Sequence, residues 1–229
     1  MPDADRESHD RATADTTLWS CALDGSLQST SDVLAAEEPL EIRVRGASIA
    51  VTMRTPGDDA ELAVGFLLSE GVIRKKSDIL EIAPCQQGDA ADRGNILNVF
   101  LAPSIEFDFE KLTRHVFASS SCGLCGKASI ESVHQHFDPV ESELRIHPDT
   151  LRGLPDKLRA QQDNFNQTGG LHAAALFDAS GKLLNAREDI GRHNAVDKAL
   201  GNQLLDGAAM SEAILMVSGR SSFEIMQKA

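Results

Sequence analysis

Two cysteines separated by two residues stand in the stretch SSSCGLCGKASIE, residues 119–131. They are Cys122 and Cys125, and a glycine follows each of them. Such a pair can bind a structural metal ion, form a redox couple or supply a sulfur nucleophile. These three interpretations make different demands on the chain around the cysteines.

Structural zinc needs four ligands, and this motif supplies two. The remaining ligands would have to come from Cys85, His115, His134 or His136. His134 and His136 are two residues apart on an expected helix and point in different directions, which makes a closed site awkward. A dithiol oxidoreductase would place the motif at a helix start after a strand, and RHVFASSS is a weak strand candidate.

A sulfur nucleophile fits the surroundings of the cysteines better. The serines before Cys122, together with Gly123 and Gly126, give the backbone wide conformational freedom, so a thiol could reach a partner and return. A helix expected to begin near Lys127 offers free N–H groups and a positive dipole end. These groups and the Lys127 ammonium favour a thiolate at Cys122 or Cys125.

A second group of candidate residues lies in REDIGRHNAVDK, residues 187–198. Gly191, Arg192 and His193 precede an expected helix over residues 194–200, so N–H groups, a guanidinium and an imidazole could converge on an anion. The alternative is that Asn194 only caps this helix while Asp189 pairs with Arg192 at the surface. The sequence leaves both interpretations open.

Two further stretches could contact a ligand. In AILMVSGRSSFE a buried strand leads through Ser218, Gly219 and Arg220 to a helix start, which is an arrangement that can bind a phosphate, although the full P-loop and G-x-G-x-x-G patterns are absent. In TGGLHAAALF the paired glycines allow close approach of a ligand, and His172 stands near a strand start. A lone histidine is more often structural than ligand-binding.

The elements that position these residues can be read from hydrophobic periodicity and turn residues. Residues 41–54 alternate around Gly46 and predict a β-hairpin. Residues 57–71 predict a helix with Asp58 and Glu61 as a capping pair and Gly71 as a stop. The other expected elements are a loop over 85–94, a strand over 95–102, a helix over 127–137, strands over 171–177 and 182–188, a helix ending at Gly201, a buried strand over 213–217, and a last helix with Ser221 and Glu224 as a capping box.

The amino-acid composition excludes some classes of protein. The 229 residues are 41% hydrophobic and 25% charged, and the net charge is −13, of which −8 lies in residues 1–41. An acidic chain disfavours general nucleic-acid binding, although a local basic site could take one phosphate ligand. No apolar run approaches the roughly 20 residues of a membrane span, and the N-terminus does not resemble a signal peptide. We therefore expect a cytoplasmic protein without membrane contact.

The expected fold class is α/β, with α+β character in the N-terminal part. Four segments are predicted: a disordered acidic tail over 1–17, an N-terminal α+β subdomain over 18–115, a mobile cysteine loop over 116–127, and an α/β domain over 128–229. The last helix stops about two turns after its start, so this domain is expected to be incomplete at its C-terminus.

Six blocks in the same order resemble the FdhD family of formate dehydrogenase accessory proteins. They are EEPLEIRVRG, VTMRTPGDDAELAVGFLLSEG, SSSCGLCGKASIE, GGLHAAALFD, REDIGRHNAVDK and SGRSSFEIMQKA, and the resemblance runs from residue 37 to 229. It implies a sulfur carrier that accepts sulfur from a cysteine desulfurase and passes it to the molybdenum bis(guanine dinucleotide) cofactor of formate dehydrogenase.

The resemblance also implies residue roles. Cys122 would carry the persulfide and Cys125 would assist, while His172, Gly191, Arg192, His193, Ser218, Gly219 and Arg220 would contact the cofactor, which a guanine nucleotide could mimic. A homodimer is expected, with a main domain similar to the cytidine deaminase-like fold. The deaminase zinc pattern is missing, so no resident metal is expected. Members of the family continue beyond the position of Ala229, which this chain does not. The alternative function is a nucleotide- or cofactor-binding chaperone whose cysteines hold zinc.

Overall fold

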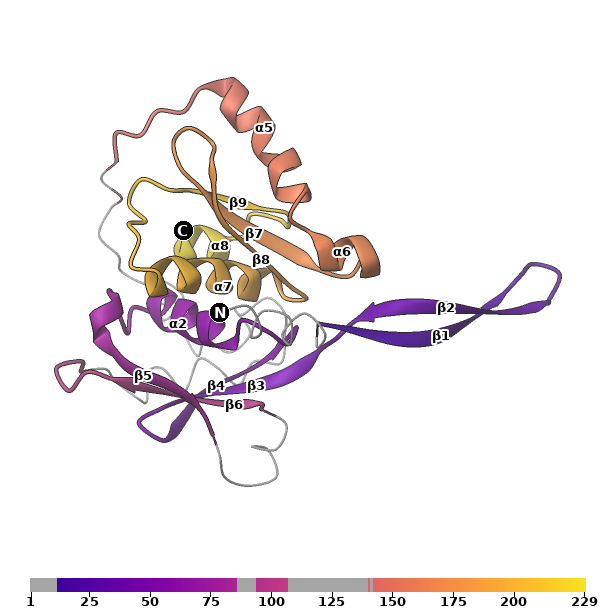
Figure 1. Ribbon diagram of the computed structural model, residues 1–229, viewed down its shortest axis with the longest axis horizontal. Helices are drawn as coiled ribbons and strands as arrows, with labels where there is room; N and C mark the ends of the chain where they lie inside the picture. Colours follow the sequence, from indigo (N-terminus) through magenta and orange to yellow (C-terminus); the bar gives the residue numbers. More distant parts are fainter. Residues whose placement is uncertain (1–11, 86–93, 107–139, 141) are drawn as a thin grey trace.

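The computed structural model describes residues 12–85, 94–106, 140 and 142–229 of the chain. Two sheets lie on opposite sides of a pair of helices, α2 (Asp59–Ser69) and α7 (Arg192–Leu205), which pack against each other (Figure 1). Helix α2 covers the N-terminal sheet and α7 covers the C-terminal sheet. The architecture is therefore mixed α/β, as the sequence predicted.

The N-terminal sheet has the strand order β4-β3-β6-β5. The predicted hairpin over residues 41–54 is confirmed, because β3 (Glu38–Val44) pairs antiparallel with β4 (Ala47–Arg54). Arg45 and Gly46 between them both have positive φ, 52° and 81°, which fits the tight turn of a two-residue hairpin. Strand β6 (Ile96–Leu101), also predicted, runs parallel to β3, and β5 (Ile79–Pro84) after the 3-10 helix η1 (Lys76–Asp78) completes the sheet.

Helix α2 confirms the helix predicted over residues 57–71, but its predicted capping pair is wrong. Asp58 has a left-handed backbone, with φ of 55°, and its side chain makes no cap hydrogen bond. The carboxylates of Asp58 and Glu61 instead face Arg187 of the C-terminal sheet. Gly71, the predicted stop, follows the helix with φ of 73°.

The C-terminal sheet has the order β8-β7-β9 and is antiparallel throughout. Strands β7 (His172–Phe177) and β8 (Leu183–Asp189) confirm the predicted pair and its turn, and β9 (Ile214–Val217) confirms the third strand, although it is half-buried rather than buried. Helix α5 (Pro148–Arg159) inserts Leu154 and Leu158 against one face of this sheet, and α6 (Asp163–Thr168) follows it.

Helix α7 does not end at Gly201 as predicted but continues to Leu205. Gly201 serves helix packing instead, because a Cβ built there would lie 1.9 Å from the carbonyl oxygen of Glu61 in α2. Gly65 of α2 plays the same part in reverse, since its Cβ would lie 1.8 Å from the carbonyl oxygen of Asp197. The two helix backbones therefore touch at these glycines.

The last helix, α8 (Phe223–Lys228), begins one residue later than predicted. Its N-cap is Ser222, whose hydroxyl accepts from the Ile225 N–H at 3.4 Å, so the predicted cap at Ser221 is wrong. Glu224 does not complete a capping box either. Its carboxylate lies 2.9 Å from Nε2 of His193, because the start of α8 packs against the start of α7.

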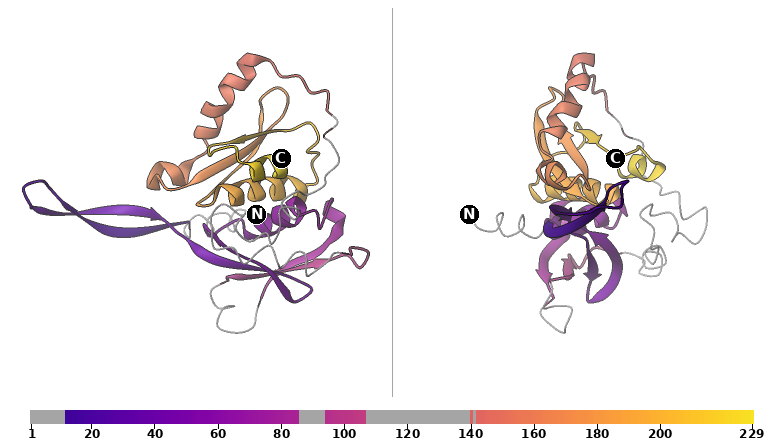
Figure 2. Two further views of the ribbon diagram at one scale, coloured as in Figure 1. Left: turned by 180° about the vertical axis from the view of Figure 1, so that it is seen from behind. Right: turned by 90° about the vertical axis from the view of Figure 1, so that its right-hand side faces the viewer.

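A two-stranded ribbon extends from the rest of the molecule. Strands β1 (Thr13–Cys21) and β2 (Leu27–Ala35) pair antiparallel over their whole length, and Figures 1 and 2 show them projecting as an arm. This corrects the predicted tail over residues 1–17, since residues 13–17 belong to β1. Thr13, Thr16 and Thr17 are β-branched and favour a strand, but the acidic composition of the segment predicted disorder instead.

Several predictions lie outside the described residues. These are the cysteine loop over 116–127, the helix over 127–137 and most of the loop over 85–94. The division of the chain at residues 18, 116 and 128 also stays a prediction. Among the described residues, no helix is both long enough and apolar enough to span a bilayer.

Candidate functional site

One edge of the C-terminal sheet collects most of the candidate residues. Strand β7 begins at this edge, while β8 and β9 end there, because both of them run antiparallel to β7. His172 is paired with Asp189, and Ala174 is paired with Val217. The segments 189–193 and 218–222 therefore meet beside His172.

Gly219 lies between His172 and Arg192. A Cβ at position 219 would stand 3.3 Å from Nδ1 of His172 and 3.4 Å from Cβ of Arg192, which is tighter than most side-chain contacts. Residues far apart in the sequence thus converge within van der Waals distance. A glycine at this point lets an imidazole and a guanidinium-bearing residue lie against one turn of backbone.

Arg192 is the first residue of α7 and is half-buried. Its Nε is buried and has no hydrogen-bond partner within the described part of the chain. The first N–H groups of an α-helix have no partners within the helix and attract anions. A guanidinium nitrogen without a partner beside such N–H groups forms a site where a phosphate or carboxylate oxygen could bind.

Two of the candidate residues, Ser218 and Gly191, form hydrogen bonds within the protein. The Ser218 hydroxyl accepts from the Ala173 N–H at 2.8 Å, and the Ser218 N–H donates to the Ala173 carbonyl at 2.9 Å. The Gly191 N–H donates to Oδ1 of Asp189 at 2.8 Å. These groups shape the site from within the protein. Arg220 is exposed at the same turn.

His193 joins α7 to α8. Its Nε2 lies 2.9 Å from Oε2 of Glu224 and 3.4 Å from Oγ of Ser222. Both His193 and Glu224 are largely buried, with side-chain exposures of 14% and 11%. The imidazole thus holds the start of α8, and with it the turn that contains Gly219, against the start of α7.

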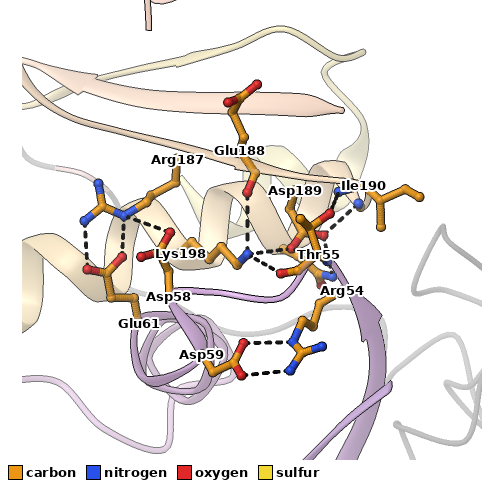
Figure 3. Close-up of polar contacts among 12 residues, drawn as sticks. Arg54, Thr55, Asp58, Asp59, Glu61, Arg187, Glu188, Asp189, Ile190 and Lys198 are labelled. Carbon is orange, nitrogen blue, oxygen red and sulfur yellow. Dashed lines mark hydrogen bonds and ion pairs between the residues drawn. The ribbon is translucent and has the colours of Figure 1, made fainter. Parts of the chain in front are cut away.

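A buried carboxylate lies beneath the start of α7, and the sequence did not predict it (Figure 3). Asp189 is fully buried and accepts from the Thr55 N–H at 3.1 Å, the Gly191 N–H at 2.8 Å, Nδ2 of Asn194 at 2.9 Å and Nζ of Lys198 at 2.9 Å. Asp189 therefore does not pair with Arg192 at the surface. Asn194 is not the cap either, because the N-cap is Gly191.

Lys198 is the cation of this buried pair and is 1% exposed. Its Nζ also donates to the Thr55 carbonyl at 2.9 Å and reaches the Glu188 carbonyl at 3.5 Å (Figure 3). One feature of the sequence could have indicated this pair. Asn194 and Lys198 are four residues apart and so lie on the same face of the helix, and Asp189 comes shortly before the helix start. Thr55, from the other half of the chain, gave no such signal.

The two cysteines of the C-x-x-C motif, Cys122 and Cys125, lie outside the described residues. Of the other two, Cys21 is exposed on the arm and Cys85 is half-buried. Within the described ranges, no group of three or more histidine, cysteine, aspartate or glutamate side chains could hold a metal ion.

Comparison with known proteins identifies the class of this chain. Residues 35–229 match the FdhD/NarQ family, and the chain belongs to it. It is 48% identical over 212 residues to the sulfur carrier protein FdhD of Streptomyces coelicolor, a match that covers 90% of this chain and 75% of that protein. The protein of the same name from Mycobacterium tuberculosis is 49% identical over 206 residues, covering 86% and 75%.

A solved structure has the same fold. The crystal structure of a formate dehydrogenase accessory protein from Desulfotalea psychrophila superimposes with a TM-score of 0.73. The match covers 95% of this chain and 79% of that one, at 24% sequence identity. It supports the arrangement of the two sheets around α2 and α7.

Proposed function

We propose that this protein is a sulfur carrier for the maturation of formate dehydrogenase. It accepts sulfur from a cysteine desulfurase as a persulfide on Cys122 and passes it to the molybdenum bis(guanine dinucleotide) cofactor, which is the substrate here. Membership of the FdhD/NarQ family and the name shared by relatives at 48% and 49% identity support the sulfur-carrying part.

The sulfur transfer is a thiol–disulfide type of exchange. The Cys122 thiolate attacks the outer sulfur of the desulfurase persulfide, the bond between the two sulfurs of that persulfide breaks, and the desulfurase cysteine leaves as a thiolate. Cys125 assists by making the same attack on the Cys122 persulfide, so that Cys122 leaves as a thiolate. Both of these steps conserve atoms and electrons, so no external oxidant is needed. Delivery to the molybdenum as sulfide takes two electrons, which the cysteine pair supplies when the free thiolate attacks the inner sulfur of the persulfide, expels the outer sulfur as sulfide and leaves a disulfide between Cys122 and Cys125.

The convergence of His172, Arg192 and Gly219 at one sheet edge is the structural observation that carries the cofactor part of the proposal. The guanine dinucleotide carries phosphates, and the buried Nε of Arg192 without a partner in the described chain fits a phosphate oxygen. In a chain with a net charge of −13, such local positive charge is the main electrostatic attraction for an anionic ligand. Gly191, His193, Ser218 and Arg220 shape the rim of this site.

Sulfur loading tests the first half of the proposal. After incubation with a cysteine desulfurase and cysteine, intact mass spectrometry should detect the mass of one extra sulfur atom, removable by a thiol reductant. Cys122→Ala should abolish this gain, while Cys21→Ala, which removes an exposed cysteine on the arm, should retain it. Full loading of Cys122→Ala would overturn the assignment. A bound zinc ion that is lost in Cys125→Ala together with folding would favour the zinc-clipped chaperone.

Nucleotide binding tests the second half. Isothermal titration calorimetry with a guanine nucleotide should show binding that weakens about tenfold or more in Arg192→Gln and by a smaller factor in Arg220→Ala, because charge-assisted hydrogen bonds are lost. Arg152→Ala is the matched control, since Arg152 is exposed on α5 and pairs with Asp149. Equal affinity in all four proteins would show that neither Arg192 nor Arg220 binds the nucleotide.

The last proposals concern the location, the oligomeric state and the partners of the protein. We place the carrier in the cytoplasm, as a homodimer, with formate dehydrogenase and a cysteine desulfurase as its partners and a deaminase-like layering in its main domain. Light scattering coupled to size exclusion measures the oligomeric state directly. A monomer at micromolar concentration would exclude the dimer.

A further inference from the structure

The Asp189 carboxylate divides its two oxygens between different parts of the molecule. Oδ1 accepts from the Gly191 N–H at 2.8 Å and from Nδ2 of Asn194 at 2.9 Å, both at the start of α7. Oδ2 accepts from the Thr55 N–H at 3.1 Å and from Nζ of Lys198 at 2.9 Å. One buried side chain therefore ties the start of α7 to Thr55, which directly follows β4 (Figure 3).

Further bonds hold the same turn from the N-terminal half. The Ile190 N–H donates to Oγ1 of Thr55 at 3.1 Å, and Nδ2 of Asn194 donates to the Met53 carbonyl at 2.8 Å. Lys198 completes the connection by donating to the Thr55 carbonyl at 2.9 Å. Residues 189–194 are thus fixed by donors and acceptors on both sides, so the direction of the first N–H groups of α7 depends on Thr55.

Stability alone does not explain this arrangement. Burying a carboxylate and an ammonium costs several kcal/mol of desolvation, and apolar residues of similar volume often stabilise a protein equally well or better. What a buried, fully bonded pair supplies is a defined geometry. Here that geometry determines where Arg192 begins the helix, and Arg192 carries the guanidinium nitrogen without a partner.

We propose that Asp189 and Lys198 form a positioning pair that couples the end of β4 to the anion site at the start of α7 and sets its ligand affinity without touching the ligand. This inference rests on the proposed phosphate site. It predicts that the pair, which reaches the N-terminal half through Thr55, controls binding more strongly than a charged pair that joins the two halves elsewhere, such as Glu61 and Arg187.

The test compares two double variants. Asp189→Asn with Lys198→Met removes both charges and nearly keeps the volumes, which avoids a lone buried charge. Its affinity for a guanine nucleotide should fall about tenfold by calorimetry, the loss expected from one misplaced hydrogen bond. The Gly191 amide should also exchange faster with deuterium, because its acceptor has lost its charge and its fixed orientation.

The control is Glu61→Gln with Arg187→Met. This pair joins β8 to α2 and is partly buried, but it lies apart from the turn at 189–194 (Figure 3). Its removal should lower stability and leave nucleotide affinity within about twofold of the parent, since no bond to residues 189–194 is lost. A Gly191 amide unchanged in this control excludes a general loosening of the molecule.

The possible results distinguish a failure of the positioning role from a failure of the phosphate site. If the parent protein binds no guanine nucleotide, the phosphate site and the positioning role are both wrong. If the parent binds and the folded Asp189→Asn, Lys198→Met variant binds equally well, only the positioning role is wrong. Should that variant fail to fold, Lys198→Gln takes its place, because it removes the cation of the pair and leaves Asp189 with its three other hydrogen-bond donors, and unchanged affinity there overturns the inference in the same way.

Discussion

The arm of β1 and β2 and the interface between α2 and α7 hold their elements together in opposite ways. In the arm, nine residue pairs are joined by the backbone ladder, while Leu18, Trp19, Leu27 and Leu34 all remain exposed. Its base touches the body where Ala35 lies against Gly170 and β2 meets α6. A two-stranded hairpin without a packed face is marginally stable by itself.

The α2–α7 interface combines backbone contact with buried polar bonds. Gly65 and Gly201 let the helix axes approach, and Arg187 of β8 reaches across to Glu61. At one end of the interface, Nζ of Lys228 donates to both Asp197 oxygens at 2.7 and 2.8 Å and to Ser69 at 2.7 Å. Because the interface is packed and bonded while the arm is not, we expect the two sheets to unfold as one unit and the arm to open separately.

The largest effect is expected from Gly201→Ala. The added methyl would meet the carbonyl oxygen of Glu61 at 1.9 Å, a backbone atom that cannot move without shifting α2. We expect the free energy of unfolding to fall by about 3 kcal/mol, at the upper end of overpacking penalties. Urea denaturation followed by circular dichroism measures it.

The matched control is Gly153→Ala in α5, where a Cβ would meet nothing within 4 Å. Alanine is the better helix former, so this change should raise stability by about 0.5–1 kcal/mol. Equal effects of the two substitutions would mean that the helix backbones are not in contact at Gly201.

The next effect concerns Lys228→Met and depends on pH. Burial raises the pKa of Asp197 above its ordinary value of 3.8, and the Lys228 ammonium works against that rise. Removing the ammonium raises the folded-state pKa further, so the folded protein holds a proton that the unfolded chain has released. The contribution of Asp197 to the stability of the variant is therefore fully present below pH 3.8 and is lost as pH rises through the raised pKa.

At pH 7 the deficit of Lys228→Met should reach about 2 kcal/mol, because a buried carboxylate has lost its partner, and it should shrink toward pH 5. Urea midpoints at several pH values measure this. The double variant with Asp197→Asn is the control and should show no such slope. A deficit that stays constant from pH 5 to 8 would contradict the role of Asp197.

Local patterns were enough to predict the elements around the candidate site. The alternation around Gly46, the strand pair on either side of residues 178–181 and the presence of helices α2 and α7 are confirmed. The start of α7 is not, because the helix begins at Arg192, two residues before the predicted start at residue 194. Each of the confirmed elements depends on the residues within it. The family resemblance implied one cofactor site for His172, Arg192 and Gly219, while their contact depends on the pairing of β7 with β8 and β9.

The parts that the sequence did not predict depend on distant partners. Gly201 has the pattern of a helix stop, and only Glu61 of α2 makes it an interior residue. Asp189 has the pattern of a surface acid beside Arg192, but it is buried because Thr55 of the other half of the chain covers it and donates to it. The acidic composition of residues 1–17 predicted disorder, but the first strand depends on pairing with β2.

A smaller effect is expected in the arm, which contains the chain's single tryptophan, Trp19, and no tyrosine is present to compete with its fluorescence. Trp19 is 69% exposed, so Trp19→Ala should change global stability by less than about 0.5 kcal/mol. In the parent, Trp19 fluorescence should change at lower urea concentrations than circular dichroism does, since the arm opens first. Coincident transitions would show that the arm is stabilised together with the body.

The smallest effect is expected at the turn of the arm. The hydroxyl and N–H of Ser26 hydrogen-bond to Asp24, the N–H at 2.9 Å, and these bonds hold the pKa of Asp24 below its ordinary value of 3.8. The bonds favour the charged form. Their stabilisation of the turn is therefore present above pH 3.8 and is lost as pH falls through the lower, folded-state pKa.

Asp178 gives an internal reference for this measurement. It lies at the turn between β7 and β8, and its pKa is lowered by Ser180 through the same kind of bonds, but the strands beside it are packed in the C-terminal sheet. Titration followed by nuclear magnetic resonance should return the Asp24 pKa toward 3.8 in Ser26→Ala and leave that of Asp178 unchanged. An Asp24 pKa that ignores Ser26 would mean that the turn of the arm is not formed in solution, and the contrast between arm and interface would then be sharper than the structure implies.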